Sequence, residues 1–330
     1  MTKDLKWPDG KKAAFSIIDD TDDAELPWIG EIYDVLRASG LRTTKTVWVY
    51  PPRDPEFVRG DSLGGNEEYV EFIRGLIESG FEIGLHNVGS GGFTREETKE
   101  GIEEFKNLLG FYPRIHINHS YNKENIYSGD KRFGWPFRNL VRLMYSRYSG
   151  FEGDIPGSDY FWGDIHKDLI KWSRSLEMDR LNVLDVVPVP YSEPRFDEYA
   201  NAFFPSTFCP NQDLFKRKVT HKNVEKLIDD RGLSIVYTHF GYYHERGVID
   251  AGFVEACEIL ESYKQDIWFA PVGEILDYLQ VQVGVQPITE WQRMRLEFEC
   301  LLTRVKYRYF VKLDDFHYKK SLGYRHRADG

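Results

Sequence analysis

The sequence predicts an α/β protein built as a (β/α) barrel, either distorted or seven-stranded. Short apolar, β-branched runs alternate with longer segments in which apolar side chains recur at helical spacing. Glycines follow several of the helical segments, as is typical where helices end. About seven such strand–helix units fit before residue 281, which favours a barrel over a short open sheet.

The expected elements follow one another in order along the chain. The first strand is the apolar run that ends at Asp19, and apolar side chains at helical spacing, Ile29 and Leu36 among them, mark the first helix. A capping-box sequence from Thr94 to Glu97 begins the third helix. Strands are expected over residues 15–19, 44–50, 81–86, 114–117, 183–187, 233–237 and 267–270, and helices over residues 24–38, 67–79, 94–109, 133–148, 220–230, 251–263 and 272–280.

The chain beyond residue 280 has a different pattern. Residues 295–301 alternate polar and apolar side chains, and residues 305–311 are rich in aromatic and β-branched residues. We therefore expect one barrel over residues 1–280 and a small β-rich extension over residues 281–330. This extension would pack on the barrel or on a partner, so a homo-oligomer is one expectation.

Composition narrows the function classes. The 330 residues carry a formal net charge of −10, which argues against binding to nucleic-acid phosphates. No run is long and apolar enough to span a membrane, and the first residues do not resemble a secretory signal. The three cysteines are widely spaced and form no motif, as in a reduced cytoplasmic protein. We expect a cytoplasmic location.

A cluster of carboxylates directly follows the first strand. Buried charges of this kind are costly unless they are paired or hold a metal ion. Asp19 and Asp20 are neighbours, so on an extended backbone their side chains point to opposite sides. One of them is therefore able to bind a cation while the other reaches for a proton. For Asp22 and Asp23 the alternative is a helix-capping cluster or a solvated acidic turn.

Histidines follow three further strands. His86 precedes a glycine-rich loop and His119 follows the fourth strand, whereas His116 lies within that strand and suits the core. Imidazole and carboxylate are ligands for zinc and related divalent ions, so Asp20 and His86 together favour a metal site. The alternative for His86 is a hydrogen bond to the loop backbone. His239 ends the sixth expected strand and suits a general acid.

Polar and aromatic residues beside these histidines are candidates for substrate contacts. We expect Asn118, Asn122 and Tyr237 to line a sugar pocket. For Asn122 and the residues that follow it, a solvated loop is an equal alternative.

These residues together resemble the polysaccharide deacetylase superfamily, the NodB-homology or carbohydrate esterase family 4 group. Residues 15–21, with Asp19 and Asp20, are similar to its first motif, which supplies a base and a metal ligand. Residues 81–86 resemble the strand that leads into its H-x-x-x-H metal motif, and residues 235–239 its catalytic-histidine motif. The resemblance spans roughly residues 10–280.

One departure concerns the metal site. Ser90 stands where the family has its second metal-binding histidine. Because catalytic zinc usually keeps three protein ligands, we expect His119 to complete the set with Asp20 and His86. The resemblance then implies that Asp19 is the base and His239 the acid.

The resulting functional expectation is a zinc-type, metal-dependent hydrolase that removes an acyl group, such as acetyl, from an N-acylated sugar or glycan precursor. Two alternatives remain open. One is a metal-free hydrolase of another C–N bond on the same barrel, and the other is a catalytically inactive glycan-binding protein.

Overall fold

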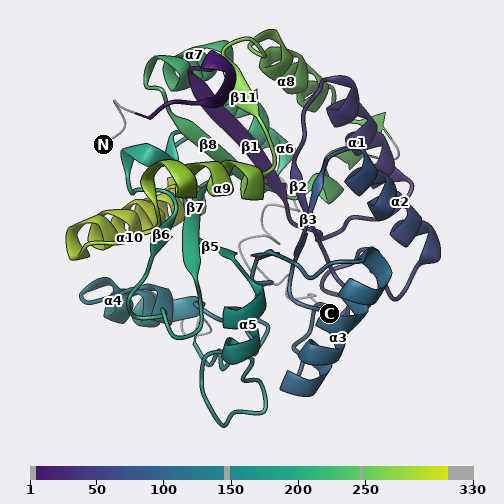
Figure 1. The fold of residues 1–330 in the computed structure, drawn as a ribbon, viewed down its shortest axis with the longest axis vertical. Helices are drawn as coiled ribbons and strands as arrows, with labels where there is room; N and C mark the ends of the chain where they lie inside the picture. Colours follow the sequence, from purple (N-terminus) through teal and green to yellow (C-terminus); the bar gives the residue numbers. More distant parts are fainter. Residues whose placement is uncertain (1–4, 145–148, 246–247, 311–330) are drawn as a thin grey trace.

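The centre of the protein is a closed barrel of parallel strands, seen in a computed structural model that describes residues 5–144, 149–245 and 248–310 (Figure 1). The ring closes because β8 pairs with β1 on one side and with β7 on the other. The predicted (β/α) barrel is therefore confirmed. In ring order its strands are β1 (Ala13–Asp19), β2 (Thr44–Val47), β3 (Glu82–Leu85), β4 (Ile115–His116), β5 (Trp172–Met178), β7 (Ala202–Phe208) and β8 (Leu233–Thr238).

Helices surround this barrel, and several of them, α1 and α2 among them, bury an apolar face (Figure 1). The capping box expected at Thr94 is present, and Gly110 ends the same helix in the left-handed conformation at φ 89°. The helices are α1 (Trp28–Ala38), α2 (Glu67–Glu78), α3 (Arg95–Leu109), α4 (Phe137–Met144), α5 (Gly163–Leu169), α6 (Gln212–Lys218), α7 (His221–Asp229), α8 (Ala251–Ser262), α9 (Val272–Val283) and α10 (Glu290–Val305).

The sequence prediction misplaces the strands between β4 and β8. Residues Val183–Asp185 form a short 3-10 helix, and the ring is completed instead by β5 and β7. β5 carries Arg174 and Glu177, and β7 contains Pro205, so neither segment has the continuous apolar character of a buried parallel strand. The remaining short strands are β6 (Tyr191–Ser192), β9 (His244–Glu245), β10 (Val248–Ile249), β11 (Ile267–Phe269) and β12 (Gln286–Pro287).

The predicted β-rich extension is wrong over residues 290–305, which form the helix α10. This helix begins with a capping box between Thr289 and Gln292 and buries Leu296 and Cys300. The alternation seen over residues 295–301 also satisfies helical spacing, because side chains four apart lie on one face of a helix. The last part of the predicted extension, residues 311–330, lies outside the described residues.

The carboxyl ends of β1 and β8 are locked together beside the barrel mouth. The amide of Asp20 donates to the carbonyl of Thr238 at 2.8 Å, which continues the pairing of the two strands. The loops that follow β1, β3, β4 and β8 therefore leave the barrel on the same side. Within the described ranges, no helix has the length and apolar character needed to cross a membrane.

Candidate metal centre

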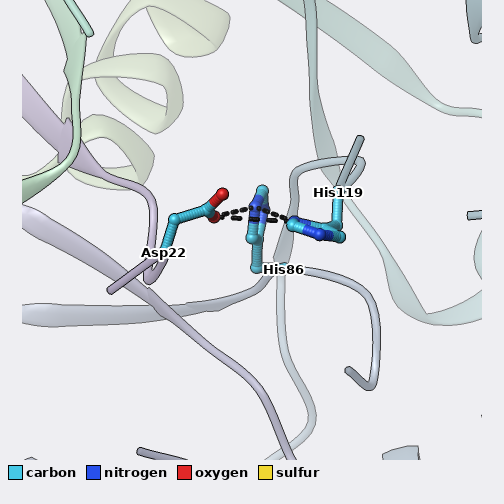
Figure 2. A group of neighbouring side chains, drawn as sticks. All are labelled: Asp22, His86 and His119. Atoms are coloured by element: carbon cyan, nitrogen blue, oxygen red, sulfur yellow. Dashed lines mark hydrogen bonds and ion pairs between the residues drawn. The ribbon is translucent and has the colours of Figure 1, made fainter. Parts of the chain in front are cut away.

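One carboxylate and two imidazoles converge at the carboxyl ends of the strands (Figure 2). Asp22 Oδ1 lies 3.1 Å from His86 Nε2 and 3.5 Å from His119 Nδ1. The two histidine nitrogens are 3.2 Å apart. The three potential ligand atoms thus form a nearly equilateral triangle, with each side chain aimed at the same point.

This triangle has the dimensions of one face of a tetrahedral metal site. Zinc bonds to imidazole nitrogen and carboxylate oxygen are about 2.0–2.1 Å long, so adjacent ligands of a tetrahedral ion lie about 3.3 Å apart. The measured sides of 3.1, 3.2 and 3.5 Å bracket that value. Catalytic zinc is commonly held by three protein ligands with a fourth position open. The donor set and its spacing therefore fit a divalent metal.

Each ligand is positioned by the loop that carries it. The backbone amide of His86 donates to the carbonyl of Val47, and that of His119 donates to Asn87 Oδ1 at 2.9 Å. The Trp48 ring contacts both imidazoles, edge-on to His119 with centroids 5.2 Å apart. These contacts limit the movement of both rings, although the second ring nitrogen of His86, Nδ1, is buried without a hydrogen-bond partner among the described residues.

The protonation states of the three side chains differ. Burial acts to raise the pKa of Asp22, but the charge of His119 and hydrogen bonds from both histidines hold that pKa well below its ordinary value. Burial lowers the pKa of His86 even though Asp20 and Asp22 oppose it. Asp22 is thus ionised and His86 neutral near pH 7, and these are the forms that bind metals. His119 differs: burial acts to lower its pKa, but the charge of Asp22 and a hydrogen bond to it raise that pKa. A metal ion would therefore have to displace a proton from His119.

Asp20, the expected metal ligand, has a different partner. Its two oxygens accept hydrogen bonds from the Arg174 guanidinium at 2.8 and 2.6 Å, and both side chains are buried. The sequence could not show this pairing because the strand that carries Arg174 was itself missed. The structure brings Asp22, two residues later, to the position expected for Asp20. The D-x-D spacing from Asp20 to Asp22 was the available signal.

Asp19, the expected base, is an internal anchor in this structure. Its Oδ2 accepts from Lys45 Nζ at 2.9 Å and from the Tyr33 hydroxyl at 3.0 Å. Its Oδ1 accepts from the amide of Phe240 at 2.8 Å. Asp19 and Lys45 have no exposed side-chain surface. A carboxylate enclosed in this way has no path to a substrate water.

His239, the expected acid, does face the cluster. Its Nδ1 lies 2.8 Å from the carbonyl of Pro210, so the proton is assigned to Nδ1 and Nε2 is left toward the site. Nε2 is 3.4 Å from the hydroxyl of Tyr237. The charge of His239 is among the influences that lower the pKa of Asp22, which indicates that the two groups are near each other.

The expected substrate residues divide into two kinds. Tyr237 lies at the site, with the Arg174 guanidinium 4.2 Å from its ring centre. The amide of Asn118 bonds the backbone of Ile126, at 2.6 and 3.1 Å, and therefore braces a loop. Asn122 is buried, and its side-chain amide bonds to the surrounding loop. It donates to the carbonyl of Gly89 and to the carboxylate of Glu124, and it accepts from the backbone amide of Gly91. The side-chain amides of Asn118 and Asn122 therefore hydrogen-bond to other residues of the protein in this structure.

Ser90 is a second point of comparison with the expected motif. Its hydroxyl donates to Asp54 Oδ1 at 2.6 Å, so it does not join the three ligands. His119, from the loop after β4, supplies the second imidazole instead. The juxtaposition of His86 and His119 agrees with the sequence prediction.

Comparison with known proteins identifies the fold. No family model and no curated protein matches the chain. The solved structure of Puue allantoinase is similar over 84% of this chain and 93% of its own, with 12% sequence identity and a TM-score of 0.52. Two structures described as polysaccharide deacetylases also match. The one from Mycobacterium smegmatis is similar over 86% of this chain and 96% of its own, with 16% sequence identity and a TM-score of 0.49. The one from Pseudomonas aeruginosa PAO1 is similar over 85% of this chain and 95% of its own, with 14% sequence identity and a TM-score of 0.48.

Many of the similar solved structures are polysaccharide deacetylases or members of carbohydrate esterase family 4. At 11–16% sequence identity these likenesses concern the fold alone. A barrel fold does not determine chemistry, so function has to be argued from the site.

Proposed function

We propose that this protein is a metal-dependent hydrolase of the deacetylase type, which releases an acyl group from an N-acylated sugar or glycan precursor. The observation that carries the proposal is the triangle of Asp22, His86 and His119, whose spacing fits a divalent ion. The position of this triangle at the carboxyl ends of barrel strands supports it, because barrel enzymes hold their active sites there.

Asp22, His86 and His119 would hold the ion, and zinc fits this donor set best. When bound, such an ion supplies Lewis acidity, which polarises an acyl carbonyl and lowers the pKa of a water. Three protein ligands would leave the fourth position of a tetrahedral ion for water or substrate. Arg174 and Tyr237 lie beside it and restrict how a substrate enters.

Asp20 is the group that we assign as general base in place of Asp19. A carboxylate offers about four lone-pair directions, so the two bonds to Arg174 leave others free to accept a proton from water. The guanidinium holds the carboxylate in one orientation. The negative charge of Asp20 tends to raise the pKa of His86, as expected of a carboxylate near the three ligands.

His239 is assigned as general acid. The Nδ1–H group donates to the carbonyl of Pro210, so in the doubly protonated form of His239 the second proton is on Nε2. Nε2 would deliver this proton to the nitrogen of the departing amine and leave the neutral imidazole. Asp20 and His239 come from strands β1 and β8, which are neighbours in the ring, so the two proton-transfer groups flank the same space. The proposed base follows β1 and the proposed acid follows β8.

A second candidate is hydrolysis of the C–N bond of a small amide that is not a sugar. Two observations favour it: Puue allantoinase has the same fold, and the cluster is enclosed, with His86, His119 and Tyr237 all buried. An enclosed site admits a small ligand more easily than a polymer. The two candidates share the same residues and differ in substrate.

The test combines metal analysis with turnover of N-acetylated sugars. Asp22→Asn should weaken zinc affinity by at least the 10- to 100-fold typical of changes around a metal, and turnover should fall with it. Asp23→Asn is the matched control, since it removes an adjacent carboxylate that is not among the three ligands. Full zinc occupancy in Asp22→Asn would contradict the site. Full turnover by metal-free protein would contradict metal dependence.

A further inference from the structure

The outward face of α10 carries a stripe of apolar side chains. Trp291, Phe298 and Leu302 are 73%, 49% and 47% exposed, and Met294 and Val305 on the same face are partly buried. Their spacing of three and four residues places them on one side of the helix. The side chains on the opposite side of α10 are buried against the rest of the protein. The helix therefore has two apolar faces and only one of them is covered by described residues.

The exposed apolar surface extends onto α4. Figure 1 shows α4 and α10 on the same side of the barrel, and the rings of Phe137 and Phe298 contact each other with centroids 6.3 Å apart. Trp135, just before α4, is 79% exposed, and Leu143 is 84% exposed. Together with Leu140 these side chains expose on the order of 800 Å², which is near the area that each partner contributes to a standard protein interface. Monomeric proteins rarely leave a patch of that size uncovered.

The stripe on α10 is complementary to itself when two helices run antiparallel. In the register that places Phe298 against Phe298 of a second copy, Met294 meets Leu302 and Trp291 meets Val305. The same register brings Glu290, at the acidic start of the helix, opposite Lys306 at its basic end. Both charged side chains are substantially exposed, and each also pairs within its own subunit, Glu290 with Arg293 and Lys306 with Asp179. Apolar positions and opposite charges thus match in a single arrangement, and the helix dipoles also favour it.

We propose that the face formed by α4 and α10 binds a second copy of this chain, giving a two-fold dimer whose axis passes near Phe298. An isologous contact of this kind uses the same patch on both subunits, so it closes on itself and does not form fibres. The proposal does not depend on the metal centre, because α10 lies on the outside of the barrel wall and contributes none of the three ligands.

The first test is the oligomeric state of the full chain, measured by light scattering and sedimentation over a range of concentrations. We expect a dimer for the wild type. Phe298→Arg should raise the dissociation constant at least about 30-fold, as for an interface hot spot, since the two arginines would face each other at the axis. Phe111→Arg is the matched control: Phe111 is a partly exposed phenylalanine that follows α3, and the dimer should be retained.

The second test fixes the register by oxidative cross-linking. Phe298→Cys alone should form a disulfide-linked dimer, whereas Met294→Cys should cross-link only when mixed with Leu302→Cys. The native cysteines are buried and do not compete. A wild type that is monomeric at every concentration would overturn the proposal. That result is also expected if another part of the same chain covers the patch. A dimer that Phe298→Arg leaves intact would overturn it as well.

Discussion

The buried pair of Asp19 and Lys45 allows a sharp test of the distinction between an anchor and a base. Asp19→Asn removes the only carboxylate that contacts Lys45 among the described residues, and it leaves an ammonium group with no exposed surface. Breaking a buried ion pair by removing one partner costs about 3–5 kcal/mol, a large fraction of the about 5–15 kcal/mol that stabilises a typical domain. We therefore expect a severe loss of stability.

The double variant separates the ion pair from the other bonds of Asp19. In Asp19→Asn with Lys45→Met, no charge remains to be compensated, and the asparagine oxygen is still able to accept from the amide of Phe240. Replacing both members of a buried pair is often nearly neutral, so much of the lost stability should return. The two changes should show a coupling of about 2–3 kcal/mol, within the range found for residues in direct contact.

The assay is urea denaturation followed by circular dichroism, with turnover measured on the folded fraction. Asp34→Asn is the control, because the exposed pair of Asp34 and Arg37 should contribute at most about 1 kcal/mol. Turnover per folded molecule of Asp19→Asn should stay within about tenfold of wild type, whereas loss of a positioned base costs about 10²- to 10⁴-fold. A stable Asp19→Asn protein with that larger loss of turnover would refute the anchor role.

Three further predictions concern Asp20, His239 and His166. Asp20→Asn should lower turnover about 10²- to 10⁴-fold while zinc content stays at the wild-type level; loss of zinc in parallel would make Asp20 a ligand. His239→Gln should lower turnover by a similar factor, and a substrate with a better leaving group should reduce the defect; equal defects for both substrates would exclude the acid role. Burial lowers the pKa of His166 to about 4, whereas the same side chain has a pKa of about 6.5 in the unfolded chain. As the pH falls, the unfolded chain therefore takes up a proton first. The free energy of unfolding should fall by about 3 kcal/mol between about pH 6.5 and about pH 4. Acid denaturation of His166→Asn should lack this contribution, and an unchanged pH dependence would contradict it.

The sequence by itself determined the barrel and most of its elements. Apolar periodicity and glycine stops located β1, β2, β3 and β8, and the capping box at Thr94 located the start of α3. These signals are local, because a buried parallel strand and a capped helix each carry their pattern in a few consecutive residues. The same local reasoning identified His86 and His119 as neighbours, since loops after barrel strands meet on one side.

The tertiary structure alone decided what each aspartate does. Three aspartates lie within four residues at the end of β1, and the sequence does not distinguish their roles. In the structure they have separate partners across the barrel: Lys45 for Asp19, Arg174 for Asp20 and two histidines for Asp22. Each of these partners lies on a different strand or loop, from 26 to 154 residues away in the chain. All three side chains are carboxylates, so their chemistry is the same. The role of each depends on which partner the folded barrel brings within hydrogen-bonding distance. No local sequence pattern predicts that pairing, because the partners are distant in the chain.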